Sequence, residues 1–413
     1  MQLIKMGSGK RRILFIVRNY NNPGAQAIRF KKICFFLSQD YDIDILMLHH
    51  EKKLDIVSEG NIRVFKLPYS YMGRKINKDL RIGNNSLVSS KGNWFKEMLK
   101  FLNFKKFFFP DTFVSEFFNV RKFLINYLKS EKVDIVVGSS FPHSVLLFSK
   151  VVKSINGSIK WFQDIGDPLN HPFYSKNFFL TFVSEYYERY FSKFVDVLVV
   201  TNKDTSDYYI QKYKNYTSNN VFIIPQGADR IEVPENFPYL ESNFFKFVYA
   251  GGFYDKIREP FELYKAISLF KTNVIFDIYG NISQKFIPSS SFDNIYYKGS
   301  ISHSSVLKSY TNSDCIVLID NSSGIQTPGK VFEVLSARRV VLFVYSNKFS
   351  PTFKYLSSFS FVYFAENNMD SISKEIQKII KDLSNSSINC AHNDDSIFWD
   401  YRASQYKILF EIG

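Results

Sequence analysis

Residues 314–345 read DCIVLIDNSSGIQTPGKVFEVLSARRVVLFVY. The stretch has an apolar run of strand length at each end, DCIVLID and RVVLFVY, and a helical pattern over 328–337 between them. Thr327 is suited to cap that helix, and Pro328 stands at the first helical position, where its missing N–H costs nothing. The stretch therefore predicts a strand, a helix and a second strand in succession, which is the building unit of a parallel β-sheet.

The same alternation extends over the whole chain. Seven apolar runs of strand length lie in the first half, at 11–17, 41–48, 61–67, 133–140, 158–164, 196–201 and 220–227. Six more lie in the second half, at 244–252, 272–280, 294–300, 314–320, 339–345 and 360–365. Helical patterns separate most of them, at 26–38, 120–128, 178–194, 259–270, 304–310, 328–337 and 370–383. This rhythm predicts the α/β class, with parallel sheets covered on both faces.

Length and composition indicate two domains. A chain of 413 residues is long enough for two ordinary cores, and residues 228–243 combine prolines and charges without a period, as a connector does. We predict one Rossmann-like, doubly wound domain over 1–240 and a second over 241–395, with a final helix over 396–413 that crosses back onto the first. Two such sheets would face a central cleft lined by the carboxyl ends of their strands, where ligands of open α/β sheets bind.

Net charge and cysteine content indicate which partners and which cellular compartment the chain fits. The formal net charge of +14 indicates an anionic partner, which can be a nucleotide, a nucleic acid or an acidic membrane surface. Cys34, Cys315 and Cys390 form no CxxC pair and are too few for a disulfide framework, so a reducing cytoplasm fits best and no structural zinc is expected. No run of about 18 or more uncharged apolar residues exists, so we expect neither a membrane span nor a signal peptide.

One acidic motif invites a metal-site interpretation. Asp42 and Asp44 lie inside an alternating strand pattern, YDIDILML, so we expect these carboxylates to face solvent. We therefore predict no metal site there.

The opening stretch also suggests a site for a phosphate. A helix that starts near Pro328 offers free N–H groups at Gly329 and Lys330, and the Lys330 side chain adds a full positive charge. Glu333 projects from nearly the same face and can accept hydrogen bonds from two neighbouring hydroxyls, such as those of a ribose. The pair could therefore hold both ends of a nucleoside diphosphate. The alternative is an exposed Lys and Glu in a first helical turn.

Two further loops follow strands of the second half. Gly251 and Gly252 in VYAGGFYDKIREP allow the backbone to approach a pyrophosphate closely, and Arg258 can make a two-pronged contact with it. Gly280 in the loop IYGN could face a base. A plain turn is the alternative interpretation of both loops.

These motifs, in this order, resemble a known family. The second half, from FVYAGGFY through QTPGKVFEVLSARRVVLF, is similar to the nucleotide-sugar-binding domain of GT-B glycosyltransferases, specifically the retaining family 4 group of bacterial O-antigen and capsule enzymes. The first half is similar in its NPGAQAIRF loop, the PD of FFFPDTF, WFQDIGDPL and FIIPQGAD. The resemblance covers nearly the whole chain and implies the GT-B fold.

The resemblance implies roles for residues of the second half. Glu333 matches the second of two family glutamates eight apart and would bind the donor ribose, whereas the first position is Ile325. The donor sugar would then be held by the backbone of the loop Gly324, Ile325, Gln326 and Thr327, or by other residues. Arg258 and Lys330 fall where cations would neutralise the diphosphate.

The resemblance also implies roles for residues of the first half. Asp164 and Asp167 in WFQDIGDP would face the donor sugar and the acceptor, and the alternative is that they cap a turn and precede a proline bend. His143 would lie at a helix start on the cleft side, although a lone histidine is more often structural. Gly24 would admit a ligand close to its loop, or end a turn. Asp164, Arg258 and Lys330 are the predicted catalytic residues.

The function implied is transfer of a hexosyl group from a nucleotide diphosphate sugar, a UDP-sugar above all, to a glycan or a polyprenyl-diphosphate-linked acceptor. The resemblance implies retention of configuration and a role in lipopolysaccharide or capsule synthesis, and we expect no metal, no further cofactor and no nucleic acid partner. The enzyme would be cytoplasmic and peripheral on the inner face of the membrane, with the basic, aromatic segment 96–118 as a membrane-binding helix. A packed helix with snorkelling lysines is the alternative for that segment.

Two other functions stay open. A nucleotide-sugar 2-epimerase shares the two-sheet architecture but would need clustered histidines and carboxylates in the cleft. A noncatalytic protein that binds polysaccharide or nucleic acid would carry its positive charge as one continuous surface.

Overall fold

The computed structural model describes residues 9–18, 20, 24–76, 108–140, 142–166, 168–169, 178–234, 243–255, 257–320, 329–390 and 394–412. The chain divides into two compact units. Unit 1 is Met1–Pro225 with Ala403–Gly413, and unit 2 is Gln226–Arg402. The sequence prediction places these divisions near residues 240 and 395 instead.

Unit 1 is built on an eight-stranded sheet of order β3-β4-β2-β1-β5-β6-β7-β8. All neighbours are parallel except β3, which runs antiparallel to β4. The strands are β1 (Arg12–Ile16), β2 (Asp42–His49), β3 (Asp55–Glu59), β4 (Ile62–Pro68), β5 (Ile135–Ser139), β6 (Lys160–Ile165), β7 (Val197–Val200) and β8 (Val221–Ile223). The chain changes direction across the sheet at β1, whose neighbours are β2 and β5.

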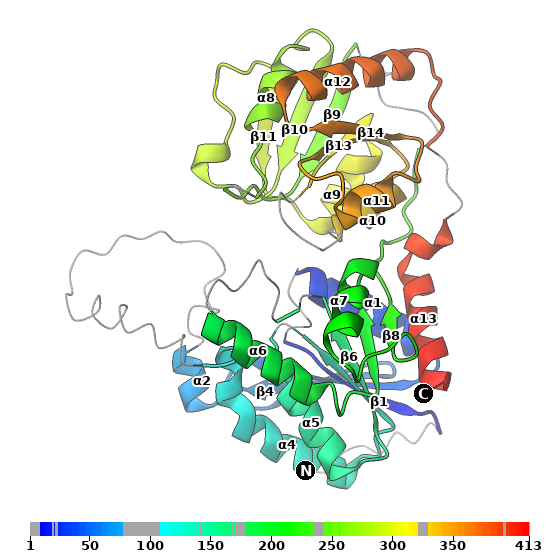
Figure 1. Cartoon of the computed structure of the whole chain (residues 1–413). Helices are drawn as coiled ribbons and strands as arrows, with labels where there is room; N and C mark the ends of the chain where they lie inside the picture. Colours follow the sequence, from blue (N-terminus) through cyan, green and yellow to red (C-terminus); the bar gives the residue numbers. More distant parts are fainter. Residues whose placement is uncertain are drawn as a thin grey trace, which may run out of the picture. The chain divides into compact units, whose positions relative to one another are not determined.

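Helices cover both faces of this sheet (Figure 1). Leu14 and Ile16 of β1 pack into the core beneath α4 (Phe117–Ser130), α5 (Val145–Ile155) and α6 (Phe178–Phe191). On the other face, the ring of Phe15 contacts Phe30 of α1 (Ala25–Leu37), and Phe162 contacts Phe410 of α13 (Trp399–Ile412). The remaining elements are α2 (Tyr71–Ile76), η3 (Thr112–Glu116) and α7 (Lys203–Lys212).

Unit 2 is built on a fully parallel sheet of order β11-β10-β9-β12-β13-β14. Its strands are β9 (Phe245–Ala250), β10 (Val274–Tyr279), β11 (Ile295–Gly299), β12 (Cys315–Ile319), β13 (Val340–Tyr345) and β14 (Val362–Glu366). The strand order reverses between β9 and β12, and the crevice outside the carboxyl ends of such a pair is where open α/β sheets bind ligands.

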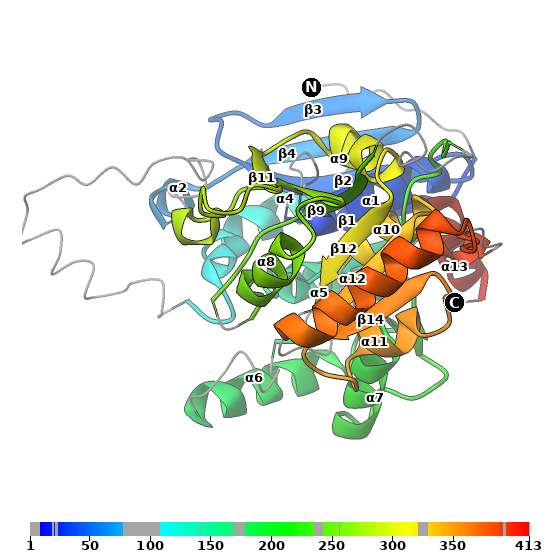
Figure 2. The same ribbon diagram turned by 90° about the horizontal axis from the view of Figure 1, so that it is seen from above.

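Helices also cover both faces of the second sheet. Figures 1 and 2 show α8 (Phe261–Ser268) and α12 (Met369–Ser384) side by side on one face. The other face carries α9 (His303–Thr311), α10 (Lys330–Ser336) and α11 (Pro351–Leu356). Two short helices, η5 (Gln284–Phe286) and η6 (Asp395–Ile397), complete the unit. Side chains that accept a hydrogen bond from a first-turn N–H fix several helix starts, namely Asn202, Ser302, Ser350 and Asn368.

The predicted α/β class with two Rossmann-like, doubly wound sheets is confirmed. Every one of the thirteen apolar runs forms a strand. The sequence prediction missed β3, because its residues DIVSE are partly or fully exposed at the sheet edge and carry no apolar run. It placed the start of α10 at residue 328, whereas the helix begins at Lys330 with Gly329 before it.

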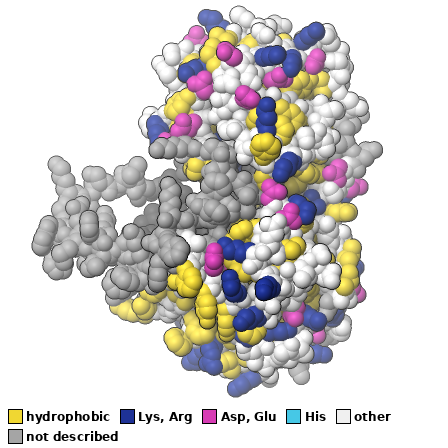
Figure 3. Space-filling view, in the orientation of Figure 1, with side chains coloured by type: hydrophobic (Ala, Val, Ile, Leu, Met, Phe, Trp, Pro, Cys, Tyr) yellow, Lys and Arg dark blue, Asp and Glu magenta, His cyan; other side chains and the backbone are white. Residues whose placement is uncertain are grey.

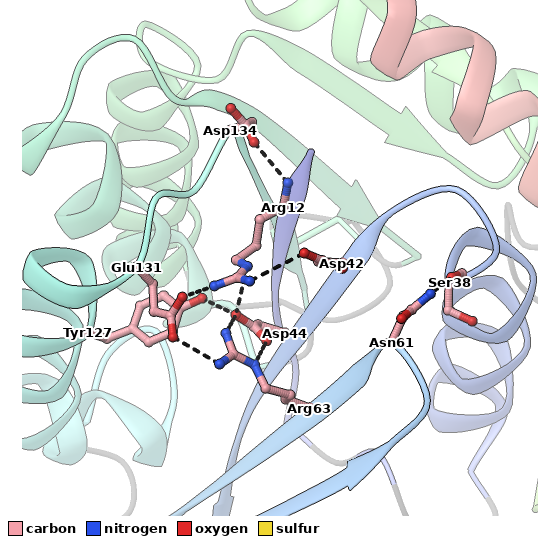
Figure 4. A network of polar contacts seen from close by, with 9 residues as sticks. All are labelled: Arg12, Ser38, Asp42, Asp44, Asn61, Arg63, Tyr127, Glu131 and Asp134. Carbon is pink, nitrogen blue, oxygen red and sulfur yellow. Dashed lines mark hydrogen bonds and ion pairs between the residues drawn. The ribbon is translucent and has the colours of Figure 1, made fainter. Parts of the chain in front are cut away.

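The prediction that Asp42 and Asp44 face solvent was wrong for Asp44, which is buried. Figure 4 shows Asp44 between two arginines: Arg63 binds it through Nε at 2.7 Å and Nη2 at 2.6 Å, and the hydroxyl of Tyr127 donates to it as well. Arg63 also donates to Glu131 at 2.9 Å, next to Arg12. Helix α4 ends over this end of the sheet, and the network ties that helix to β2 and β4.

A second buried ion pair lies in unit 1, close to the residues at which the chain leaves this unit, after Pro225, and returns to it, at Ala403. Arg29 of α1 donates to the Asp164 carboxylate from Nε at 3.1 Å and from Nη2 at 2.9 Å. The same guanidinium donates to the carbonyl oxygens of Ile224 at 2.9 Å and Pro225 at 2.7 Å, and the Tyr406 hydroxyl of α13 donates to Asp164. The Arg29 guanidinium therefore binds Ile224 and Pro225, the last residues before the chain leaves unit 1, and Asp164 joins it to α13, the helix in which the chain returns.

Within unit 2, the segment that follows Pro225 and the segment that precedes Ala403 are hydrogen-bonded to each other. Ala228 N–H donates to Ile397 O at 2.8 Å, and Trp399 N–H donates to Ala228 O at 3.1 Å. Arg402 Nε donates to Gln226 O at 3.2 Å. These bonds explain why residues 226–230 belong to unit 2 although their sequence is typical of a connector. Residues 235–242 of the predicted connector lie outside the described part of the chain.

We predict that Arg29→Met destabilises the protein by about 3–5 kcal/mol, because it leaves the Asp164 carboxylate buried without its cation. Urea unfolding followed by fluorescence measures the loss. Arg230→Met is the matched control, since Arg230 pairs with Asp395 and Asp400 at the surface and its loss should cost about 1 kcal/mol or less. The double variant Arg29→Met/Asp164→Leu should recover part of the stability. Equal effects of Arg29→Met and Arg230→Met would contradict this account.

Candidate functional site

Residues from two distant loops meet at the carboxyl ends of β9 and β12, where the strand order of unit 2 reverses. Lys330, the first residue of α10, donates from Nζ to the carbonyl oxygen of Ala250 at 2.7 Å. A methyl group added at Gly251 would lie 3.2 Å from that nitrogen. Lys330 and Arg258 line one cavity together with Tyr249 and Asp320. The structure thus brings together Gly251, Arg258 and Lys330, as parallel strands require of loops at the same sheet edge.

Glycines let the backbone segments in this site approach closely. Gly251 N–H donates to Tyr279 O at 2.8 Å, and Gly280, which follows β10, has φ of +136°. A Cβ on Gly280 would overlap the carbonyl group of Gly251. At Gly252, an added Cβ would lie 3.1 Å from the Tyr254 hydroxyl. Side chains cannot be accommodated at Gly280, so the loops after β9 and β10 pack directly backbone on backbone.

Arg258 is held beside the glycine loop by a short turn. Tyr254 N–H donates to Arg258 O at 3.0 Å, and Arg258 N–H donates back to Tyr254 O at 2.9 Å. The neighbouring Tyr249 hydroxyl donates to Gly252 O at 2.9 Å. Burial raises the pKa of Tyr249, and the nearby Arg258 guanidinium lowers it in part. The guanidinium is therefore positioned against Tyr249 at the wall of the cavity.

Burial disfavours the charged form of Lys330 in this site. Burial lowers the pKa of the Lys330 ammonium, Glu333 raises it in part, and Arg258 lowers it further. Two cations thus lie near one another with little solvent around Lys330. An anionic group bound between them would offset both the desolvation and the mutual repulsion.

Glu333 lies one helical turn from Lys330 and is mostly buried. Burial raises the pKa of its carboxyl group, while His303 and Lys330 act in the opposite direction and Asp229 adds to the rise. His303 Nε2 of α9 lies 3.9 Å from Glu333 Oε1. Sequence reasoning missed His303 and Asp229. His303 begins a helix after β11, so its place at a carboxyl-end loop was the available signal.

Asp320 is a third residue that the sequence prediction missed. It directly follows β12, is buried, and lines the cavity with Arg258 and Lys330. The cavity holds about 340 Å³ of empty space, including the part open to solvent. The signal was the last letter of DCIVLID, an acid at the carboxyl end of an apolar strand. Gln226 also lies at this edge, because a Cβ on Gly329 would be 3.4 Å from its Cγ.

Several predicted site residues lie outside the described part of the chain. They are Gly324, Ile325, Gln326 and Thr327 of the loop before α10, and Asp167 after β6.

The other predicted residues of unit 1 occupy buried or ordinary positions. Asp164 is 3% exposed, and its carboxylate binds Arg29 and Tyr406 within the unit. His143 is buried ahead of α5, and burial lowers its pKa to about 4, so the imidazole is neutral near pH 7. Its carbonyl accepts from Tyr187 at 3.0 Å. Gly24 caps α1, and a Cβ there would meet nothing within 4 Å, so no described neighbour requires a glycine.

The predicted membrane segment 96–118 is described only from residue 108. That part contains η3 and the first turn of α4. Asp111, of the PD motif, accepts from the backbone N–H and the hydroxyl of Ser144 at 3.0 and 2.8 Å, which fixes the start of α5. Residues 96–107 lie outside the described part. Among the helices described, none combines the length and apolarity that a bilayer crossing requires.

Solved structures with the same fold were found by comparison of coordinates. Sucrose-phosphate synthase from Thermosynechococcus elongatus aligns over 98% of this chain and 100% of its own, with a TM-score of 0.64 and 12% identity. A trehalose-6-phosphate protein from E. coli bound with UDP-2-fluoro glucose aligns over 97% and 99%, with a TM-score of 0.63 and 10% identity. HepE from Anabaena, in complex with UDP and glucose, aligns over 98% and 100%, with a TM-score of 0.59 and 8% identity.

The chain has the GT-B fold. The alignments run over both sheets and nearly the full length of each protein, so the likeness concerns the whole GT-B architecture and not one domain of it. No family model and no curated protein sequence matches the chain. At 8–12% identity the likeness establishes the GT-B fold alone, and the chemistry has to be argued from the site.

We predict that Gly280→Ala destabilises unit 2 by about 2–4 kcal/mol, because a Cβ strains the backbone and overlaps the Gly251 carbonyl. Gly299→Ala is the control: it has φ of +77° but meets nothing within 4 Å, so it should cost about 1–2 kcal/mol. Thermal unfolding of both variants gives the comparison. Equal losses of stability in the two variants would show that glycine is needed at position 280 only for its positive φ and not for the close approach to Gly251.

Proposed function

We propose that this chain is a glycosyltransferase that binds a nucleotide diphosphate sugar in unit 2. The observation that carries the proposal is the cluster of Lys330, Arg258 and Gly251 at the reversal of strand order in a sheet of a GT-B protein. Solved neighbours whose structures hold UDP with glucose or UDP-2-fluoro glucose support a UDP-sugar as the donor.

Different residues would bind the diphosphate, the ribose and the base of the donor. The diphosphate would lie against the backbone at Gly251, between Arg258 and Lys330, in the cavity that Asp320 also lines. The ribose hydroxyls would donate to Glu333, one turn further along α10. The loop after β10, at Gly280, would face the base.

Catalysis would depend on stabilising the leaving group. As the bond between the anomeric carbon and the diphosphate oxygen breaks, negative charge grows on the diphosphate, and Arg258 and Lys330 stabilise it electrostatically. The acceptor oxygen forms the new bond to the anomeric carbon and gives up its proton. The resemblance to the retaining family 4 group favours retention, with the leaving phosphate taking that proton, so no side chain is assigned as the base.

Unit 1 would supply the acceptor side. The carboxylate of Asp164 already binds Arg29 and Tyr406, so we give it a positioning role and assign rate enhancement to Arg258 and Lys330. A glycan or polyprenyl-diphosphate-linked acceptor, a place at the inner face of the membrane and a role in surface polysaccharide synthesis are the finer parts of the proposal. They rest on the resemblance of NPGAQAIRF and WFQDIGDPL to the family.

The alternative functions predict different observations. On the face that Figure 3 shows, Lys and Arg side chains lie in separate groups among acidic and apolar ones, which disfavours on that face the continuous basic surface of a nucleic acid or polysaccharide binder. An epimerase would convert a UDP-sugar to its 2-epimer without an acceptor, a change that proton NMR of the nucleotide sugar detects.

We predict that the protein binds UDP and that Lys330→Met and Arg258→Met each weaken binding about tenfold to a hundredfold, since each removes a charge-assisted contact. Isothermal titration calorimetry measures the dissociation constants. Lys374→Met on α12 is the matched control and should bind as the wild type does. If no nucleoside diphosphate binds the wild type, the proposal loses its support. If binding survives both substitutions unchanged, the site lies elsewhere.

We predict that UDP-glucose binding weakens as the pH falls from neutral. Burial holds the pKa of Glu333 above its usual value, so the carboxylate is present above that raised pKa and lost as the pH falls through it. UDP-glucose is the suitable ligand because its esterified diphosphate does not titrate in this range. Glu333→Gln should lose the pH dependence, and His303→Gln should keep it but move it to higher pH, because His303 lowers the pKa of Glu333. A dependence unchanged in Glu333→Gln would exclude Glu333 as the ribose acceptor.

A further inference from the structure

Helix α6 presents an aromatic and cationic face to solvent. Phe182, Tyr186 and Tyr190, which recur at four-residue spacing and so share one face, are 62%, 68% and 42% exposed. Arg189 on the same face and Lys193 in the turn that follows are exposed as well. We call these five residues the α6 outer face. In Figure 3, hydrophobic side chains lie together with Lys and Arg side chains over this helix.

The charge around the α6 outer face is positive. Lys150 of α5 lies with its Nζ 3.4 Å from the ring centre of Phe194, and the ring of Phe194 contacts Tyr190. The acidic residue nearest the face in sequence, Glu185, is paired with Lys212 at 2.7 Å. Three cations therefore accompany three exposed aromatic rings, while the neighbouring acid is already neutralised.

The opposite face of α6 is fixed to the rest of unit 1. Glu188 is buried and accepts from the hydroxyls of Tyr209 and Tyr213, both at 2.7 Å. Its Oε1 also accepts from Leu169 N–H at 3.0 Å, in the segment that follows β6. Tyr187 donates to the carbonyl of His143, which precedes α5. The helix is therefore rigidly seated, and its outer face is an ordered surface.

We propose that the α6 outer face binds the surface of an anionic lipid bilayer. Soluble surfaces seldom expose several large aromatic side chains in one row, and such rows mark sites of interaction. Phe and Tyr rings enter the interfacial layer of a bilayer, where their apolar bodies are buried and the tyrosine hydroxyls stay hydrated. Lys and Arg beside them are attracted by anionic headgroups.

The composition of the face favours a bilayer over a protein partner. The exposed rings of the face lie on the outer side of a single helix. The face offers a row of aromatic rings and a positive charge without a defined pattern. Both suit the surface of an anionic bilayer, whose negative charge is uniform. The net charge of +14 acts in the same direction.

This contact would place particular loops near the lipid. Through Glu188 and Tyr187, α6 is bonded to Leu169 after β6 and to His143 after β5. Both lie at the carboxyl ends of the unit 1 strands. The proposal deepens the proposed function, which includes a place at the inner face of the membrane, by assigning the contact to a surface outside the segment 96–118; it does not depend on nucleotide binding.

Co-sedimentation with vesicles tests the proposal. The full-length protein should sediment with vesicles of about equal parts phosphatidylglycerol and phosphatidylcholine, less so at high salt, and not with phosphatidylcholine alone. Arg189→Glu/Lys193→Glu should weaken this binding about tenfold or more, and Phe182→Ser about fivefold or more. Thermal unfolding and UDP titration of each variant separate loss of this surface from loss of the fold or of the nucleotide site.

Matched controls exclude attraction by net charge or by any exposed ring. Lys374→Glu/Lys381→Glu on α12 makes the same change in net charge, and Phe349→Ser removes a ring that is 80% exposed in unit 2. Both should bind vesicles as the wild type does. The proposal is overturned if the wild type ignores anionic vesicles, as expected for a face that binds an acidic protein, or if the controls lose as much binding as the α6 variants.

Discussion

The buried ion pair between Arg29 and Asp164 is the contact on which the organisation of the chain depends. Burial alone would lower the pKa of Arg29, but Asp164 and Tyr406 raise it above its ordinary value, so the guanidinium stays charged. Its remaining N–H groups satisfy the carbonyls of Ile224 and Pro225. A charge buried this deeply is tolerated when it is paired and hydrogen-bonded. These contacts fix three segments at once: α1, the exit from unit 1 and the returning helix α13.

The candidate site of unit 2 uses buried charge differently. In unit 1 the charges neutralise each other, whereas Arg258 and burial both lower the pKa of Lys330 and Glu333 offsets this only in part. Burial disfavours the charged form of both Lys330 and Glu333. Such an arrangement makes little sense as a stabilising device, because a hydrophobic pair would serve the fold better. It does make sense as a site completed by an anion beside the lysine and by hydroxyl donors beside the glutamate.

The sequence predicts those features that depend on local pattern or on the geometry of parallel sheets. Apolar runs located every strand except β3, which is an exposed edge strand, and the meeting of Gly251 with Lys330 follows because loops at the carboxyl ends of neighbouring parallel strands share one edge. The burial of Asp164 could not be predicted, since its partner Arg29 is 135 residues away. For the same reason the pairing of His303 with Glu333 was missed, because it depends on where α9 packs beside α10.

Helix α13 contributes residues to both units, because the division between them falls within it, between Arg402 and Ala403. Its residue Tyr406 binds Asp164, and one turn earlier Arg402 lies over the ring of Phe332, 5.6 Å from its centre. Phe332 is part of α10, between Lys330 and Glu333. Arg402 also binds Gln226 O, in the segment that leaves Pro225. Within unit 1, Tyr406 therefore joins α13 to the ion pair, and within unit 2, Arg402 joins the start of the same helix to α10.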